Sequence, residues 1–144
     1  MSLQDKINSI HSFKDSLNGN LIGIEKEGLR VAEDGTIAQP PHPKSFGSAL
    51  THPEITTDFS EALVEIVTKP IQGSHNVINE LSKIHHYVQH HLPESERFWP
   101  ASMPCILRGK TNIPIAYYGE SNIGKMKTVY RRGLSNRYGS VMQA

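Results

Sequence analysis

The first helix is predicted by apolar residues that recur every three or four positions near the N-terminus. The spacing predicts an amphipathic helix over residues 2–18. Ser2 and Asp5 have the spacing of a capping box at its start, and Gly19 is a typical residue just past its end. The apolar stripe that this helix needs to bury comprises Leu3, Ile7, Ile10, Phe13 and Leu17.

The pattern then changes to alternation, which is typical of strands. Strands are predicted over about 21–38, folded as a hairpin because Asp34-Gly35 carries turn chemistry. The proline-rich stretch that follows has no period and predicts an irregular loop that packs through Phe46 and Leu50. The segment 61–68 fits a helix or a strand, and its β-branched residues favour a strand.

Two further helices are predicted in the second half of the chain. Ser74 is expected to cap a helix over 74–91, whose buried stripe is Val77, Leu81, Ile84 and Val88. The stretch between Pro93 and Gly119 predicts loops with one or two short strands, and another helix is predicted over 123–135. Hairpin spacing of the strands predicts an α+β fold, with a mostly antiparallel sheet flanked by helices.

Composition narrows the class of protein. The 144 residues are 37% hydrophobic and 20% charged, as in one soluble globular domain or part of one. No run approaches the ~20 apolar residues of a membrane span, and the N-terminus has no signal-peptide pattern, so a cytoplasmic protein without a membrane partner is expected. The net charge of +1 argues against a dedicated nucleic-acid binder. A lone Cys105 excludes an intramolecular disulfide and any zinc site with several thiolates.

Carboxylates placed among apolar residues are the strongest candidates for chemistry. Glu25 and Glu27 are two apart on a predicted strand and therefore share a face. Like charges on a half-buried face repel each other, and a divalent cation relieves that repulsion. Asp58, Glu61 and Glu65 repeat the pattern in a second segment. Oxygen ligands without sulfur favour Mg²⁺ or Mn²⁺, ions that typically accompany ATP, although a merely solvated acidic face also fits.

Other motifs are weaker. Gly119, Gly124 and Lys125 match the spacing of a P-loop, but Met126 stands where a hydroxyl is required. His86 and His90 have metal-ligand spacing without a third ligand, which favours a solvated role at a helix end. Cys105 has no activating neighbour in sequence, which favours a packed thiol.

Basic and aromatic residues alternate in the last predicted helix. Such a stripe can bind single-stranded nucleic acid, but beside two acidic segments a counter-charge to those acids is the better interpretation. The fork of Arg131 suits a substrate carboxylate or phosphate. The stripe comprises Lys125, Lys127, Tyr130, Arg131, Arg132, Arg137 and Tyr138.

Four blocks of the chain together resemble the bacterial glutamate-cysteine ligase family, also called gamma-glutamylcysteine synthetase. In order they are GIEKEGLRV, SALTHPEITTDFSEALVEIVT, WPASMPC and YGESNIGKMKTVYRRGLSNRYGSVMQ. The resemblance implies a glutamine synthetase-like antiparallel fold and Mg²⁺ or Mn²⁺ as cofactor. It implies a cytoplasmic enzyme that uses ATP to join L-glutamate, through a γ-glutamyl phosphate, to L-cysteine in the first step of glutathione biosynthesis.

The resemblance also implies roles for particular residues. The family's metal-binding acids fall on Glu25, Glu27, Asp58 and Glu65, and Arg131 falls on an arginine that contacts substrate and serves catalysis. The positions that line the family's cysteine-side pocket fall on Phe59, Tyr130, Leu134 and Gln143.

Family members of this type are several times longer than 144 residues. The resemblance therefore implies the N-terminal part of a single larger catalytic domain, inactive alone, whose unpaired strand edges favour self-association. Three alternatives remain at this stage: a related ligase with another amine substrate, a non-catalytic phosphate or nucleic-acid binding module, and an inert fragment with solvated carboxylates.

Overall fold

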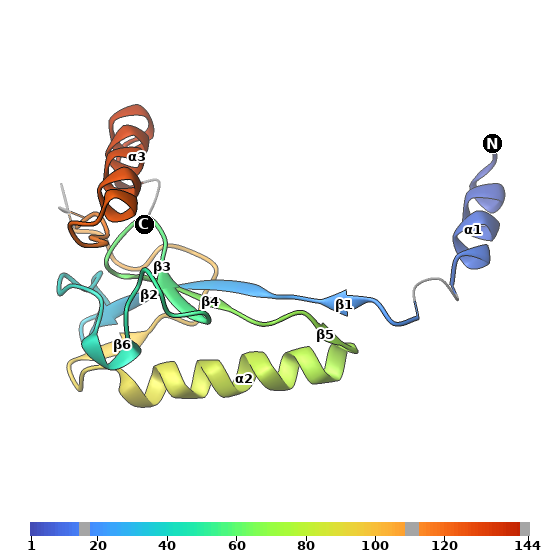
Figure 1. Cartoon of the computed structure of the whole chain (residues 1–144), viewed down its shortest axis with the longest axis horizontal. Helices are drawn as coiled ribbons and strands as arrows, with labels where there is room; N and C mark the ends of the chain where they lie inside the picture. The colour runs from blue at the N-terminus through green and yellow to red at the C-terminus, as the bar shows by residue number, and fades with distance from the viewer. Residues whose placement is uncertain (15–17, 109–112, 142–144) are drawn as a thin grey trace.

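A small antiparallel sheet with helices on its two sides forms the body of the protein in the computed structural model (Figure 1). The structure describes residues 1–14, 18–108 and 113–141. The α+β class predicted from the sequence is confirmed. Its elements are α1 (Leu3–Ser12), β1 (Leu21–Ile22), β2 (Glu25–Ala32), the 3-10 turn η2 (Lys44–Phe46), β3 (Ile55–Thr57), β4 (Leu63–Val67), β5 (Ile71–Gln72), α2 (Ser74–His91), β6 (Glu96–Phe98) and α3 (Asn122–Tyr138).

The main sheet has the strand order β3-β4-β2-β6, and every neighbouring pair is antiparallel. The long central strand β2 pairs with β4 along its first half and with β6 along its second half. Beyond the sheet, β1 and β5 form a two-stranded extension that leads toward α1 (Figure 1).

The two faces of the sheet have separate cores. On the side of α2, Val64 and Ile66 of β4 are fully buried against Ile84 and Val88, together with Phe46 of the predicted irregular loop. On the opposite side, Leu29, Leu63 and Phe59 form a second cluster, against which Leu134 of α3 packs. Helices α2 and α3 therefore cover different faces (Figure 1).

The N-terminal helix is shorter than predicted and packs differently. The capping box of Ser2 and Asp5 is present, but α1 ends at Ser12 instead of continuing to residue 18; residues 15–17 lie outside the described part. No residue of α1 is buried by the described chain, so its apolar stripe, with Leu3 and Ile10 about two-thirds exposed or more, is uncovered. Figure 1 shows α1 well away from the sheet.

The strands are shorter and more often interrupted than the sequence pattern predicts. The range 21–38 contains β1 and β2, and its hairpin return is a single bridge from Val31 to Ile37 around Gly35, whose φ of 78° suits glycine. The predicted strand 61–68 begins only at Leu63, because Glu61 lies in the turn that connects β3 to β4. The strands β3 and β5, of three and two residues, are too short to give a periodic signal.

The later helices follow the sequence closely. Helix α2 occupies the predicted range and buries Val77, Ile84 and Val88, but its N-cap is Gly73 and not Ser74. Helix α3 runs from Asn122 to Tyr138, longer than the predicted 123–135; the Ser121 hydroxyl caps its start and Gly139 is the C-cap at its end. Among the described residues, no helix combines the length and hydropathy of a bilayer span.

Candidate metal and substrate site

The pairing of β2 with β4 brings acidic residues from two segments together. In this register Glu27 lies directly opposite Glu65, and Glu25 lies two residues along β2 on the same face. Directly opposite side chains of an antiparallel pair are separated by about 5 Å at Cβ, so the two carboxylates are neighbours. They lie on the face away from α2, since the alternate residues Val64 and Ile66 pack on that helix.

Asp58 joins this pair from the turn after β3. Partial desolvation, followed by the charges of Asp58 and Glu25, raises the pKa of the Glu27 carboxyl above its ordinary value. Desolvation and the charges of Asp58, Glu27 and Glu25 likewise raise the pKa of Glu65, while Lys127 of α3 lowers it. Glu25 and Asp58 therefore lie close enough to Glu27 and Glu65 to raise the pKa of those two carboxyls, and we call Glu25, Glu27, Asp58 and Glu65 the acid cluster.

The acid cluster is open as it stands. Within the described ranges, no three carboxylate, imidazole or thiol side chains surround one point closely enough to hold a metal ion. The donors are nevertheless all carboxylate oxygens, the ligands that Mg²⁺ and Mn²⁺ prefer, and they repel one another without a cation. The chemistry of the cluster thus fits a divalent cation that would draw the side chains inward.

Arg131 of α3 contacts this cluster through Asp58. Its guanidinium donates to the Asp58 backbone carbonyl and, at 3.0 Å, to a carboxylate oxygen of Asp58. The arginine is buried, and its guanidinium lies 4.7 Å from the ring centroid of Tyr118. The predicted substrate-contacting arginine is therefore beside the acids, and in this structure it is engaged with one of them.

The residues predicted to line the cysteine-side pocket lie in different environments. Phe59 is fully buried in the core beneath the cluster, and Leu134 packs against that core. Tyr130 is 64% exposed on α3 and borders an apolar groove formed with Met126 and the stems of its neighbours. Gln143 lies outside the described residues. The structure thus brings Phe59 and Leu134 together and leaves Tyr130 on the outer surface of α3.

An open pocket of about 200 Å³ adjoins the acid cluster beside Glu27. Leu29 and Leu63 line it from the sheet, and Trp99 and the segment 101–104 line it from the loop after β6. The Trp99 indole donates to the Met103 carbonyl, which closes this loop on itself. The sequence reasoning missed Trp99, although it stands in the block WPASMPC, because no local period points to a pocket wall.

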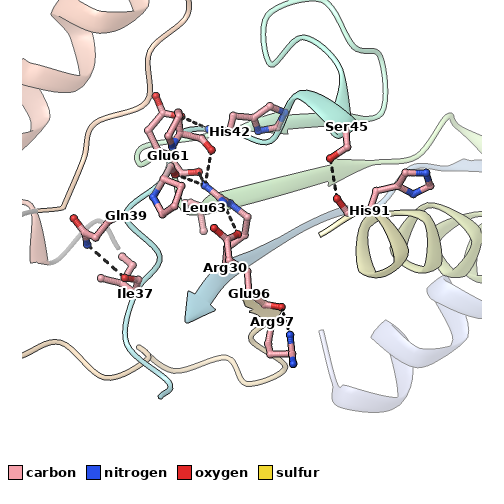
Figure 2. A network of polar contacts seen from close by, with 12 residues as sticks. Arg30, Ile37, Gln39, His42, Ser45, Glu61, Leu63, His91, Glu96 and Arg97 are labelled. Carbon is pink, nitrogen blue, oxygen red and sulfur yellow. Dashed lines mark hydrogen bonds and ion pairs between the residues drawn. The ribbon is translucent and has the colours of Figure 1, made fainter. Parts of the chain in front are cut away.

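Glu61, the fifth candidate acid, has a structural role. Its two carboxylate oxygens accept hydrogen bonds of 2.7 Å from the backbone N–H groups of His42 and Tyr117. Its backbone carbonyl accepts from Arg30, which is fully buried and paired with Glu96 (Figure 2). Glu61 therefore joins loops around the sheet and is not a member of the acid cluster.

The weaker motifs also have structural explanations. A Cβ added to Gly124 would lie 2.4 Å from the Gly119 carbonyl oxygen, so the glycine pair of the P-loop spacing permits a close approach of two backbones. His86 and His90 stack on each other while each bonds a backbone carbonyl of α2. Cys105 is buried, and desolvation raises its pKa, as expected of a packed thiol.

The arrangement as a whole matches solved ligases. The chain aligns with a glutamate–cysteine ligase from Francisella tularensis, crystallised in complex with AMP, at a TM-score of 0.82 and 43% identity, covering 86% of this chain and 25% of that one. It aligns with a bifunctional glutathione synthetase from Pasteurella multocida at a TM-score of 0.76 and 34% identity, covering 92% and 17%. These neighbours are ligases with a glutamine synthetase-like fold, and this defines the class.

Sequence comparison narrows the class to one family. Residues 6–144 match the family described as glutamate-cysteine ligase. The chain is 53% identical over 128 residues to the glutamate–cysteine ligase of Alcanivorax borkumensis and 55% identical over 122 residues to that of Hahella chejuensis. The matched regions are 89% and 85% of this chain but only 24% and 23% of those relatives. This chain belongs to the glutamate-cysteine ligase family and spans about a quarter of the length of its relatives.

Proposed function

We propose that this chain contributes one wall of a glutamate–cysteine ligase active site, in which the acid cluster holds Mg²⁺ or Mn²⁺. The observation that carries the proposal is the register of β2 and β4, which sets Glu27 opposite Glu65 with Asp58 and Glu25 beside them. Two cations of α3 lie beside these four carboxylates: Lys127 lowers the pKa of Glu65, and Arg131 pairs with Asp58.

The proposed reaction is the ATP-dependent ligation of L-glutamate to L-cysteine, the first step of glutathione biosynthesis. The γ-carboxylate of glutamate takes the terminal phosphoryl group of ATP to form a γ-glutamyl phosphate, and the cysteine amine then displaces phosphate. A bound divalent cation supplies charge neutralisation between an anionic carboxylate and an anionic triphosphate. The acid cluster orients that cation, and the chain needs no nucleophile of its own.

The same proposal assigns substrate contacts to residues outside the acid cluster. Phe59, Tyr130 and Leu134 contribute to the cysteine-side pocket, with Gln143 beyond the described residues. Arg131 is proposed to contact substrate from α3, where its charge already lies beside Asp58. The proposed partners of the active site are small-molecule substrates, with neither nucleic acid nor a membrane among them, and the setting is cytoplasmic.

We propose that residues 1–144 do not complete the ligation alone. The open geometry of the acid cluster and the share of the relatives that the chain covers support this. The strands β3 and β6 are the outer strands of the main sheet in the described chain, and edge strands favour self-association of the isolated chain. Sedimentation equilibrium at rising concentration tests that association, and a monomer throughout would contradict it.

A chimera tests the function directly. The 144 residues replace the matching 128 residues of the Alcanivorax borkumensis ligase, and ADP formation that requires both glutamate and cysteine is measured. The chimera is expected to turn over, while the isolated chain yields no ADP. Glu65→Gln in the chimera is expected to lower kcat/KM at least about 100-fold, because one metal ligand is lost.

The matched control is Glu94→Gln, which makes the same chemical change at an exposed position outside the acid cluster. It is expected to stay within about twofold of the parent chimera, as surface substitutions usually do. Activity in Glu65→Gln equal to that of the control would overturn the proposal.

A further inference from the structure

Tyr118, which the proposed function does not use, contacts the backbone of Asp58 and the two cations beside the acid cluster. Its side chain is buried, with 4% of the residue exposed, in the segment that leads into α3. The phenol hydroxyl donates to the Thr57 carbonyl and lies 3.1 Å from the Asp58 carbonyl, and it accepts from the Thr57 hydroxyl at 2.8 Å. The neighbouring Tyr117 is exposed and bonds Glu120 instead.

Two cationic side chains of α3 also lie over the ring of Tyr118. The Lys127 ammonium lies 4.5 Å from the ring centroid and the Arg131 guanidinium 4.7 Å from it. Cations at this distance from a desolvated aromatic face are attracted to the ring. Arg131 in turn holds both the backbone and the carboxylate of Asp58.

Asp58 depends on these contacts for its position. It lies in the turn between β3 and β4, outside the strand ladder, and its own N–H makes a long 3.3 Å bond to the Leu63 carbonyl. Glu25, Glu27 and Glu65 are fixed by the register of two strands, whereas Asp58 is fixed from α3 and the segment before it. Groups that hold a metal ligand in place commonly change metal affinity about 10–100-fold when removed.

We propose that Tyr118 is a positioning residue that fixes Asp58 in the acid cluster, with its hydroxyl on the backbone at 57–58 and its ring behind Arg131. The inference rests on the proposed function, because Asp58 matters only as a ligand of the cation. A merely structural Tyr118 would fill the core, and removal of its hydroxyl would then change stability without changing metal affinity.

The experiment compares Tyr118→Phe with Tyr117→Phe in the 144-residue chain, which delete the same hydroxyl at adjacent positions. Binding of Mn²⁺ alone is followed by loss of the free-ion EPR signal, below the unfolding temperature of each variant. Tyr118→Phe is expected to weaken Mn²⁺ binding about 10-fold, and Tyr117→Phe less than twofold. Hydrogen exchange of the amides of residues 58–62 is expected to quicken in Tyr118→Phe alone.

Thr57→Val, which removes the hydroxyl that orients the phenol, replaces Tyr118→Phe if that variant does not fold. Unchanged Mn²⁺ affinity in the folded variant overturns the inference. The proposed function fails separately, if Glu65→Gln binds Mn²⁺ as tightly as the parent chain. If the parent chain binds no Mn²⁺, this wall does not hold the ion without the rest of the ligase, and the exchange of residues 58–62 alone decides whether Tyr118 fixes Asp58.

Discussion

The two faces of the main sheet are built from the same strands but have opposite properties. On the α2 side, Val64 and Ile66 have no exposed surface and meet an apolar helix. On the other side, their neighbour Glu65 faces Glu27, and both carboxyls have raised pKa values from partial burial and mutual repulsion. Period-two alternation lets one strand stabilise the fold with every second residue and carry unfavourable charge with the others.

The stability of this chain resides mainly on the α2 face of the sheet. Burial of aliphatic side chains against α2 stabilises the sheet, and the acid cluster subtracts from that stability as long as no cation is bound. In this chain the packed α2 face of the same strands offsets the repulsion in the acid cluster. Each prediction below changes one face and leaves the other in place.

The largest effect is expected from the α2 face. Ile66→Ala deletes a fully buried side chain and is expected to lower the free energy of unfolding by about 2–4 kcal/mol, from lost burial and the cavity left behind. Urea unfolding followed by circular dichroism measures this. Ile123→Ala, on an aliphatic side chain that is 56% exposed, is the control and should change little. Equal losses in the two variants would show that this face does not dominate stability.

Sequence alone could predict part of this division. The pair Glu25 and Glu27 follows from two-residue spacing on one strand, and the α2 stripe follows from helical spacing. The position of Glu65 opposite Glu27 depends on strand register, which is set by pairing between distant segments.

Burial and packing partners likewise depend on contacts between distant segments, which local sequence patterns do not show. Tyr117 and Tyr118 are identical in local sequence terms, and only the chain's path buries one and exposes the other. The stripe of α1 was predicted to be covered, but amphipathic spacing says that a helix can pack, and not which surface it meets. Glu61 resembled a ligand because the local pattern cannot show that two backbone N–H groups occupy its carboxylate.

A medium effect is expected from His42, which packs edge-on against Phe46 of the α2-side core. Burial, together with the charges of Arg30 and His52, lowers the pKa of His42 to about 4. In the unfolded chain the imidazole takes up a proton near pH 6.5, and in the folded chain it does not. The contribution of His42 to the free energy of unfolding is therefore fully present above pH 6.5 and is lost as the pH falls toward 4.

His42→Leu removes this titration. Between pH 7 and pH 4.5 the parent chain is expected to lose about 1–2 kcal/mol more free energy of unfolding than the variant, an amount reduced because the residue as a whole is only partly buried. Urea midpoints at both pH values measure the difference. The exposed imidazole of His75 provides the control His75→Leu, and a pH dependence unchanged in His42→Leu would contradict the assignment.

The smallest effect, with the opposite sign, is expected from the acid face. Because the pKa of Glu65 is raised in the folded chain, its contribution to stability is present below the ordinary value of 4.5 and is lost as the pH rises through the raised value. At pH 7 without metal, Glu65→Gln is therefore expected to stabilise the chain, by no more than about 1 kcal/mol because solvent still screens this partly buried group.

A divalent cation is expected to reverse the relative stability of the parent chain and Glu65→Gln. Saturating Mg²⁺ binds the folded parent chain and raises its unfolding midpoint, in proportion to the logarithm of its concentration over the dissociation constant. Glu65→Gln loses a ligand and gains less, so the variant that is more stable without Mg²⁺ becomes the less stable one with it. Crossing midpoints in a thermal titration from 0 to 20 mM Mg²⁺, on the order of ten times a millimolar dissociation constant, would show both signs in one experiment. Parallel curves would show that the acid cluster of this chain does not bind Mg²⁺ without the rest of the ligase, and the two faces of the isolated chain would then differ only in solvation.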